Sequence, residues 1–85
     1  MPEISRFLGI TIRMHYRDHA PPRFHAHYGD YEVTIEIESG VVTGRFPERA
    51  LSAVLEWHEL NRPALLLDWR KAEHRETLDA IPPLE

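Results

Sequence analysis

The stretch RFHAHYGDYEVTIEIE, residues 23–38, decides the fold of this chain. Apolar and polar residues alternate on both sides of Gly29-Asp30, which is the pattern of two half-buried antiparallel strands. Gly29-Asp30 itself suits a two-residue hairpin turn, and such a turn fixes which residues face each other. The predicted partners are Tyr28 with Tyr31, His27 with Glu32, Ala26 with Val33, His25 with Thr34 and Arg23 with Glu36.

The same alternation extends the sheet on both sides of this hairpin. A second two-residue turn at Ser39-Gly40 is expected to place Ile37 opposite Val42 and Val33 opposite Phe46. We therefore predict a four-stranded antiparallel meander in the first half of the chain. Its strands are expected at residues 7–16, 23–28, 31–38 and 41–46.

From Pro47 onward the apolar residues recur with the period of a helix. Proline suits the first turn of a helix, and Asn61-Arg62-Pro63 indicates a break. The pattern predicts helices over residues 47–60 and 63–75, followed by an extended tail over 77–85. The expected architecture is a single α+β domain spanning residues 1–85, with both helices packed on one face of the sheet.

The composition excludes several classes of protein. The 85 residues contain no cysteine, so disulfides and thiolate metal sites are ruled out. A formal net charge of −4 is poorly suited to a surface that tracks phosphates. No apolar run approaches the roughly 20 residues that cross a bilayer, and MPEISRF lacks the features of a signal peptide. We expect a cytoplasmic protein with no membrane contact.

Polar side chains gather on the face of the sheet that the helices leave uncovered. His25 and His27 are two residues apart on one strand, so their imidazoles leave the same face about 7 Å from each other. The loop between the first two predicted strands adds further charged groups at one end of this face. The candidate binding residues are Arg13, His15, Asp18, His19, Arg23, His25, His27 and Glu32. Our leading interpretation is a protein-binding module that docks a partner through this face and loop.

Two other functions remain open on the same residues. In the first, His15, His25 and His27 hold a metal ion while Asp18 or Glu32 activates water, as in a hydrolase or nuclease. Against it, Arg23 brings a permanent positive charge, so we expect no cofactor, with zinc or another divalent metal as the alternative. The simplest explanation is a set of cross-strand polar pairs, each worth ~0.2–1 kcal/mol. In the second function, nucleic acid binds directly to a set of arginines, namely Arg6, Arg13, Arg23 and Arg45.

Four segments resemble one prokaryotic family over almost the full length. They are ISRFLGITIRM at 4–14, DHAPPRFHAHYG at 18–29, GRFPERALSAVLEW at 44–57 and IPPL at 81–84. The family is catalogued as domain of unknown function 4160. The residues that match its central motif are His19, Pro21, Pro22, Phe24, His25, Tyr28 and Gly29. The family pattern has histidine where this chain has Arg23.

What the resemblance implies is a small stand-alone bacterial protein with no established activity. Members are often encoded beside another small protein, an arrangement that looks like a toxin–antitoxin pair. The resemblance therefore implies a protein partner encoded by an adjacent gene. A free edge strand in the predicted sheet makes a homodimer a second candidate assembly.

Overall fold

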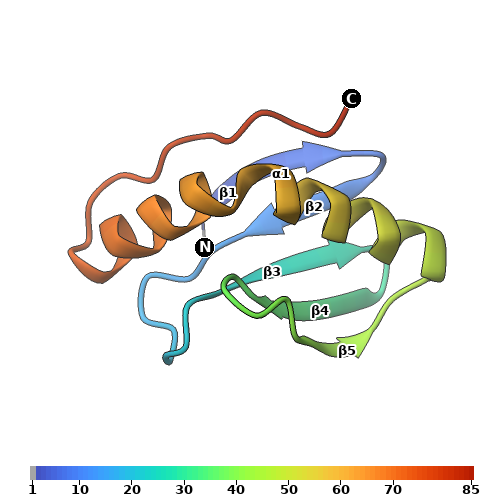
Figure 1. The fold of residues 1–85 in the computed structure, drawn as a ribbon, viewed down its shortest axis with the longest axis horizontal. Coiled ribbons are helices and arrows are strands. Elements are labelled where there is room, and N and C mark those ends of the chain that lie inside the picture. Colours follow the sequence, from blue (N-terminus) through green and yellow to red (C-terminus); the bar gives the residue numbers. More distant parts are fainter. Residues whose placement is uncertain (1) are drawn as a thin grey trace.

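The computed structural model describes residues 2–85 and shows an α+β fold, in which one helix packs on one face of an antiparallel sheet (Figure 1). Met1 lies outside the described residues. The five strands follow one another across the sheet in the order β1-β2-β3-β4-β5. The strands are β1 (Glu3–Phe7), β2 (Ile10–Arg13), β3 (Arg23–Tyr28), β4 (Tyr31–Glu36) and β5 (Val42–Arg45), and the helix is α1 (Glu48–Glu73).

The central hairpin is confirmed in every predicted pair. β3 and β4 run antiparallel, with Tyr28 opposite Tyr31 and His27 opposite Glu32, and the register continues to Arg23 opposite Glu36. Gly29 in the turn has a φ of 58°, a backbone conformation that glycine adopts without steric cost. The alternation of residues 23–36 therefore decides both the register and the face on which each side chain lies.

The prediction of one strand over residues 7–16 is wrong, because this region contains a turn between two strands. β1 and β2 pair with each other around Leu8 and Gly9. These two residues have φ values of 50° and 77°, as the two central residues of a tight hairpin turn require. Leucine rarely adopts positive φ, so its presence hid the turn from a pattern-based prediction.

The predicted turn at Ser39-Gly40 is also wrong, because residues 37–41 form a longer loop. β4 and β5 pair with Ile35 opposite Val42, two residues away from the expected register. Ile37 still bonds on the β3 side, where its backbone N–H donates to the carbonyl of Pro22 at 2.9 Å, while the N–H of Glu36 donates to the carbonyl of Val41 at 3.0 Å where the loop meets β5. A shift of two residues keeps each side chain on its predicted face, so the apolar core survives the error.

The prediction of two helices is wrong as well, since a single kinked helix runs from Glu48 to Glu73. Asn61 has non-helical angles (φ −126°, ψ 18°), and Pro63 follows inside the helix. Proline lacks a backbone N–H and clashes with the preceding turn, which explains the kink. The Asn61 side chain donates from Nδ2 to the Trp57 carbonyl at 2.8 Å, so that carbonyl stays bonded and the helix continues.

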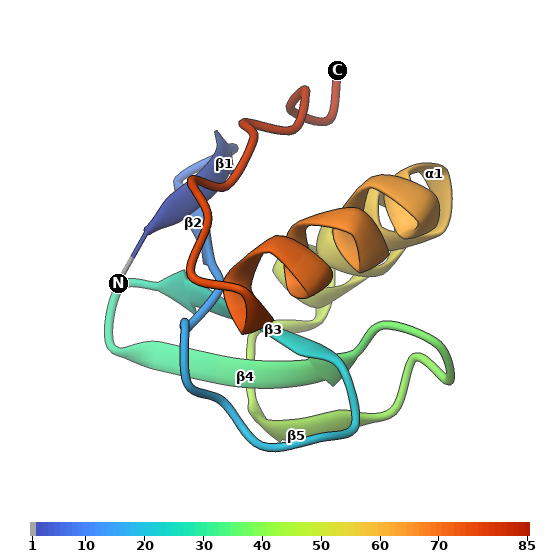
Figure 2. The ribbon, with the colours of Figure 1, turned by 90° about the vertical axis from the view of Figure 1, so that its left-hand side faces the viewer.

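The core lies between α1 and the sheet, and the chain after α1 closes one side of it (Figure 2). Trp57 of α1 is fully buried and contacts the rings of Phe7 and Phe24. Three hydrogen bonds hold the tail against the rest of the chain: Asp79 N–H donates to Asp68 Oδ1 at 2.9 Å, Ile81 N–H donates to the Ile4 carbonyl at 2.7 Å, and Trp57 Nε1 donates to the Pro82 carbonyl at 2.9 Å. The ion pair between Lys71 and Asp79 is a further contact. Helix and tail thus share one face of the sheet, and the opposite face carries the polar residues.

Candidate functional site

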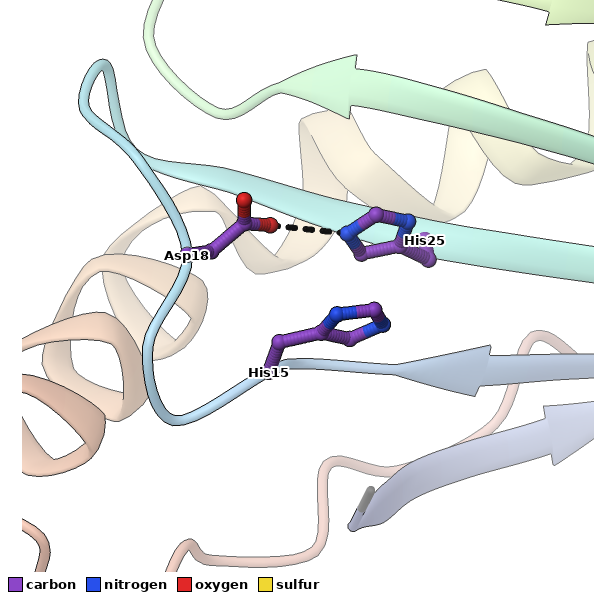
Figure 3. Close-up of side chains that lie close together, drawn as sticks. All are labelled: His15, Asp18 and His25. Carbon is purple, nitrogen blue, oxygen red and sulfur yellow. Dashed lines mark hydrogen bonds and ion pairs between the residues drawn. The ribbon is translucent and has the colours of Figure 1, made fainter.

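Three ionisable side chains meet at the end of the polar face (Figure 3). His15 follows β2, Asp18 lies in the loop between β2 and β3, and His25 is in β3. One nitrogen or oxygen from each lies within 4.8 Å of the others. We call these three residues the His15–Asp18–His25 cluster.

The loop that carries Asp18 is fastened at both ends. At its start, Met14 is buried in the core and its N–H donates to the Pro2 carbonyl at 3.2 Å. At its end, the Pro22 carbonyl accepts a hydrogen bond from Ile37 N–H. Because Met14 points into the core, the next side chain, His15, points to the polar face. Two consecutive prolines then stiffen the return into β3.

His25 sits at the centre of the cluster with acceptors at both ring nitrogens. Its Nε2 donates to Asp18 Oδ2 at 2.8 Å, and both side chains are nearly buried, with 11% and 12% of their surface exposed. On the other side of the ring, Nδ1 lies 3.4 Å from Glu32 Oε2 and 3.4 Å from Thr34 Oγ1. The ring is therefore oriented from two directions, by the loop and by β4.

His15 packs its ring flat against that of His25. The ring centroids are 3.8 Å apart and the planes differ by 11°. Burial is the main cause that lowers the pKa of His15 below 6.5, and the charge of His25 lowers it further, whereas Asp18 and Glu32 act in the opposite direction. The Nε2 atom of His15 is buried and has no hydrogen-bond partner among residues 2–85.

Asp18 is held as a carboxylate. Burial by itself acts to raise the pKa of Asp18, but hydrogen bonds from His25 and from the backbone N–H of His19 outweigh it, so the pKa lies below 3.8. The nearby charges of His25 and Arg23 act in the same direction as these bonds. The cluster thus combines a carboxylate with a histidine whose neutral form is favoured.

A comparison with known protein families identifies the chain. The model of the family described as "Domain of unknown function (DUF4160)" matches residues 9–70. The chain belongs to this family. No curated protein and no solved structure matches it. The matched region contains the whole His15–Asp18–His25 cluster and most of α1, so both lie in the part of the chain that the DUF4160 model covers.

The remaining predicted binding residues of this DUF4160 chain lie around the cluster. Arg23 turns toward the loop and donates to the carbonyls of Pro21 and Ala20 at 3.3 and 3.4 Å. His27 lies beside Glu32, with Nδ1 3.7 Å from a carboxylate oxygen. The side chain of Arg13 is half-buried on the same face, and His19 is exposed in the loop. In the described structure, Asp18 rather than His27 is grouped with His15 and His25.

A second surface lies on α1, at the junction that the sequence pattern predicts as a break between two helices. Leu60 and Leu67 are 70% and 51% exposed, and Pro63 and Ala64 between them are exposed as well. We call these four residues the α1 apolar patch. Next to it, a groove of about 390 Å³ runs between the helix and the tail; it is lined by Glu56, Trp57, Leu60, Asn61, Pro82, Pro83, Leu84 and Glu85.

The sequence predicts no membrane-spanning segment, and α1 is the helix to which this prediction applies. Within residues 2–85, no helix combines the length and the apolar character needed to cross a bilayer.

Proposed function

We propose that this DUF4160 chain is a protein-binding module that acts with a protein encoded by a neighbouring gene, as in a toxin–antitoxin pair. The observation that carries the proposal is the α1 apolar patch. Leu60 lies just before the kink at Asn61 and Leu67 follows it, and both side chains are exposed. Single exposed leucines are common on protein surfaces, but two exposed leucines with an exposed proline and alanine between them on one stretch of helix favour a protein contact.

The patch is not required by the fold of the chain. The side chains of α1 that fill the core, such as Leu65 and Trp69, lie on the opposite side of the helix. Leu60 and Leu67 leave most of their apolar surface in water, which is unfavourable by about 25 cal/mol for each Å² that a partner would bury. A partner with an apolar contact segment would recover this free energy.

The polar face of the sheet is the second candidate docking surface. Its charged side chains already interact with other groups of the same chain, unlike the exposed leucines of α1. His25 and Asp18 bond each other, His27 lies beside Glu32, and Arg23 bonds loop carbonyls. A partner that docked there would have to replace these interactions with equally good ones, since a charge stripped of both water and partner is costly. This difference is why we place the main docking surface on α1.

Metal-dependent hydrolysis is the less favoured function. A hydrolase needs a cleft beside its catalytic groups to hold the substrate. Two hollows on the described chain lie elsewhere: one is the groove beside the α1 apolar patch, and the other, of about 170 Å³, is lined by residues of the first hairpin, Tyr28 and α1. Neither includes a residue of the His15–Asp18–His25 cluster.

The experiment is copurification of the tagged chain with the product of the adjacent gene, both expressed together. Leu60→Glu with Leu67→Glu should abolish the complex, because charges replace the apolar contact. Leu8→Glu is the matched control, since Leu8 is also 70% exposed but lies in the β1–β2 turn. It should leave the complex intact. Loss of the complex only on replacing His27 and Arg23 would move the docking surface to the polar face, and absence of any complex at micromolar concentration would overturn the pairwise proposal.

Self-association is a separate part of the proposal. β5 forms one edge of the sheet and its residues are mostly exposed, so its outer backbone groups are available for strand addition. A second copy that paired there would form a symmetric dimer with a continuous sheet. Light scattering of the isolated chain measures this directly: a monomeric mass at high micromolar concentration would contradict it.

A further inference from the structure

We propose that His15, Asp18 and His25 form a binding site for a divalent transition-metal ion of the zinc class, which ties the β2–β3 loop to the sheet. The inference concerns the opposite side of the molecule from the α1 apolar patch and does not depend on the proposed partner.

The first argument is the set of donor atoms. Two imidazole nitrogens and one carboxylate oxygen are ligands that zinc accepts, with a water completing the tetrahedron. Zinc bonds these atoms at about 2.0–2.2 Å, so ligands of one ion lie roughly 3.3 Å apart. The three candidate atoms already lie within 4.8 Å of one another, and His25 Nε2 and Asp18 Oδ2 are 2.8 Å apart. The cluster therefore needs only side-chain rotations, chiefly of the His15 ring, to close on an ion.

The second argument is that neighbouring polar groups hold two of the ligands, His25 and Asp18, in position. A histidine that binds metal through one nitrogen usually donates its other N–H to a carboxylate or carbonyl, which fixes the ring. With Nε2 of His25 directed at the cluster, its Nδ1 lies 3.4 Å from the carboxylate of Glu32 and from the hydroxyl of Thr34. Asp18 is oriented in the same way, because its Oδ1 accepts from the backbone N–H of His19 at 2.8 Å.

The third argument is the state of His15. Its Nε2 is buried with no partner among residues 2–85, so a polar atom has lost water without gaining a bond. Such atoms are uncommon in folded proteins and call for a ligand or water at the site. The stacked geometry also means that His15 is held by packing rather than by a hydrogen bond, so turning its ring toward an ion breaks no bond described here.

Arg23 is the main opposing charge. Its guanidinium donates to the Pro21 and Ala20 carbonyls rather than into the cluster. Its positive charge lowers the affinity for a cation without occupying the position of a ligand. Replacing Arg23 by glutamine should therefore strengthen metal binding, which distinguishes a cation site from a set of surface pairs.

The test uses the tag-free full chain after treatment with a chelator. Isothermal titration with ZnCl₂ at pH 7.5 should give one ion per chain, and the melting temperature should rise by several degrees once free zinc exceeds the dissociation constant. Co²⁺ in place of zinc should give the visible absorption of a tetrahedral site with nitrogen and oxygen ligands. This spectrum is recorded on the native chain, so it does not depend on whether a variant folds.

The variants separate this site from adventitious binding. Asp18→Asn and His15→Gln should remove the stoichiometric binding, and Glu32→Gln should weaken it about tenfold or more through the ring of His25. His27→Asn is the matched control, because His27 lies on the same strand and face but outside the cluster; it should bind zinc like the native chain. No stoichiometric binding to the native chain, or equal loss in the His27 variant, would overturn the proposal.

Discussion

The imidazole ring of His15 lies face to face with that of His25, with centroids 3.8 Å apart. His15 follows β2 and His25 lies in β3, ten positions further along the sequence, so the pairing of β2 with β3 brings the two rings together. Two protonated rings at this distance would repel each other, and His25 has a carboxylate at each end while His15 has none in hydrogen-bonding contact. The stack therefore favours a neutral His15.

This relationship predicts that stability falls as the solution is acidified from pH 7 to pH 5. Burial first, and then His25, lowers the pKa of His15 in the folded chain below the value of 6.5. The unfolded chain thus binds more protons than the folded chain in this range. The stabilisation that comes from neutral His15 is therefore present above pH 6.5 and is lost as the pH falls through the pKa of the folded chain. Melting curves with EDTA should show a steeper fall for the native chain than for His15→Gln. Parallel pH profiles would show that His15 titrates alike in both states.

Replacement of Gly29 by valine should destabilise the central hairpin by more than ~1 kcal/mol. Gly29 has a φ of 58°, which a β-branched residue resists, and a Cβ added there would have no atom within 4 Å. The cost therefore comes from the backbone alone. Gly29→Asn is the control, since asparagine tolerates this conformation and should cost much less. Urea unfolding of the three chains gives the comparison; equal midpoints would mean that the turn is not strained.

The strand pairs show most clearly which parts of the fold can be predicted from the sequence. The β3–β4 hairpin could be predicted residue by residue, because strict alternation and a glycine turn both act locally. The β1–β2 turn could not, because Leu8 adopts a positive φ that local propensity disfavours and that the two-residue turn between the paired strands requires. The sequence pattern divides the helix at Asn61 because proline normally ends a helix, whereas in the structure the helix continues past Pro63 with a kink at Asn61, where the Asn61 side chain bonds the Trp57 carbonyl.

The candidate site was only partly accessible to sequence reasoning. The sequence predicts that His15 and His25 lie on the same polar face, and the structure stacks their rings. The role of Asp18 could not be derived in this way, because its position depends on the path of an irregular loop. The α1 apolar patch could not be predicted because Leu60 and Leu67 fall in two separate predicted helices, 47–60 and 63–75, and their relative position depends on the kink.

The buried carboxyl group of Asp68 should lower the free energy of unfolding at neutral pH. It is a buried carboxyl whose Oδ1 accepts from Asp79 N–H at 2.9 Å, while its Oδ2 has no partner in the described chain. Burial is the main cause that raises the pKa of Asp68 above 3.8. The folded chain then binds more protons than the unfolded chain. The stabilisation that comes from protonated Asp68 is therefore fully present below pH 3.8 and is lost as the pH rises through the pKa of the folded chain.

Asp68→Asn should therefore gain stability relative to the native chain as the pH rises from 3 to 7, because the amide has no charge to bury. Asp79→Asn is an intermediate comparison: it keeps the buried carboxyl and its backbone bond but removes the Asp79 charge, which also raises the pKa of Asp68, so its stability should depend on pH less than that of the native chain and more than that of Asp68→Asn. Chemical denaturation at both pH values measures the difference. A constant difference between native and Asp68→Asn would show that the buried carboxyl does not titrate differently in the folded state.

Trp57 joins the core to the tail, and two substitutions should separate these roles. Trp57→Ala removes a fully buried ring that contacts Phe7 and Phe24, and should cost ~3–5 kcal/mol. Trp57→Phe keeps most of the ring volume but removes the donor that bonds the Pro82 carbonyl. The second change should cost only about 1 kcal/mol in global stability.

The distinguishing measurement is amide hydrogen exchange at Ile81, whose N–H bonds the Ile4 carbonyl beside the Trp57 contact. In Trp57→Phe the tail loses its bond next to Ile81 and keeps the bond at Asp79, so the Ile81 amide should exchange faster while amides of β3 keep their native protection. Trp69→Phe is the matched control, because Trp69 is also buried but has no hydrogen bond to the tail among those described. Faster exchange at Ile81 in the Trp69 variant alone would mean that the tail is held by packing against α1 and not by the Trp57 bond.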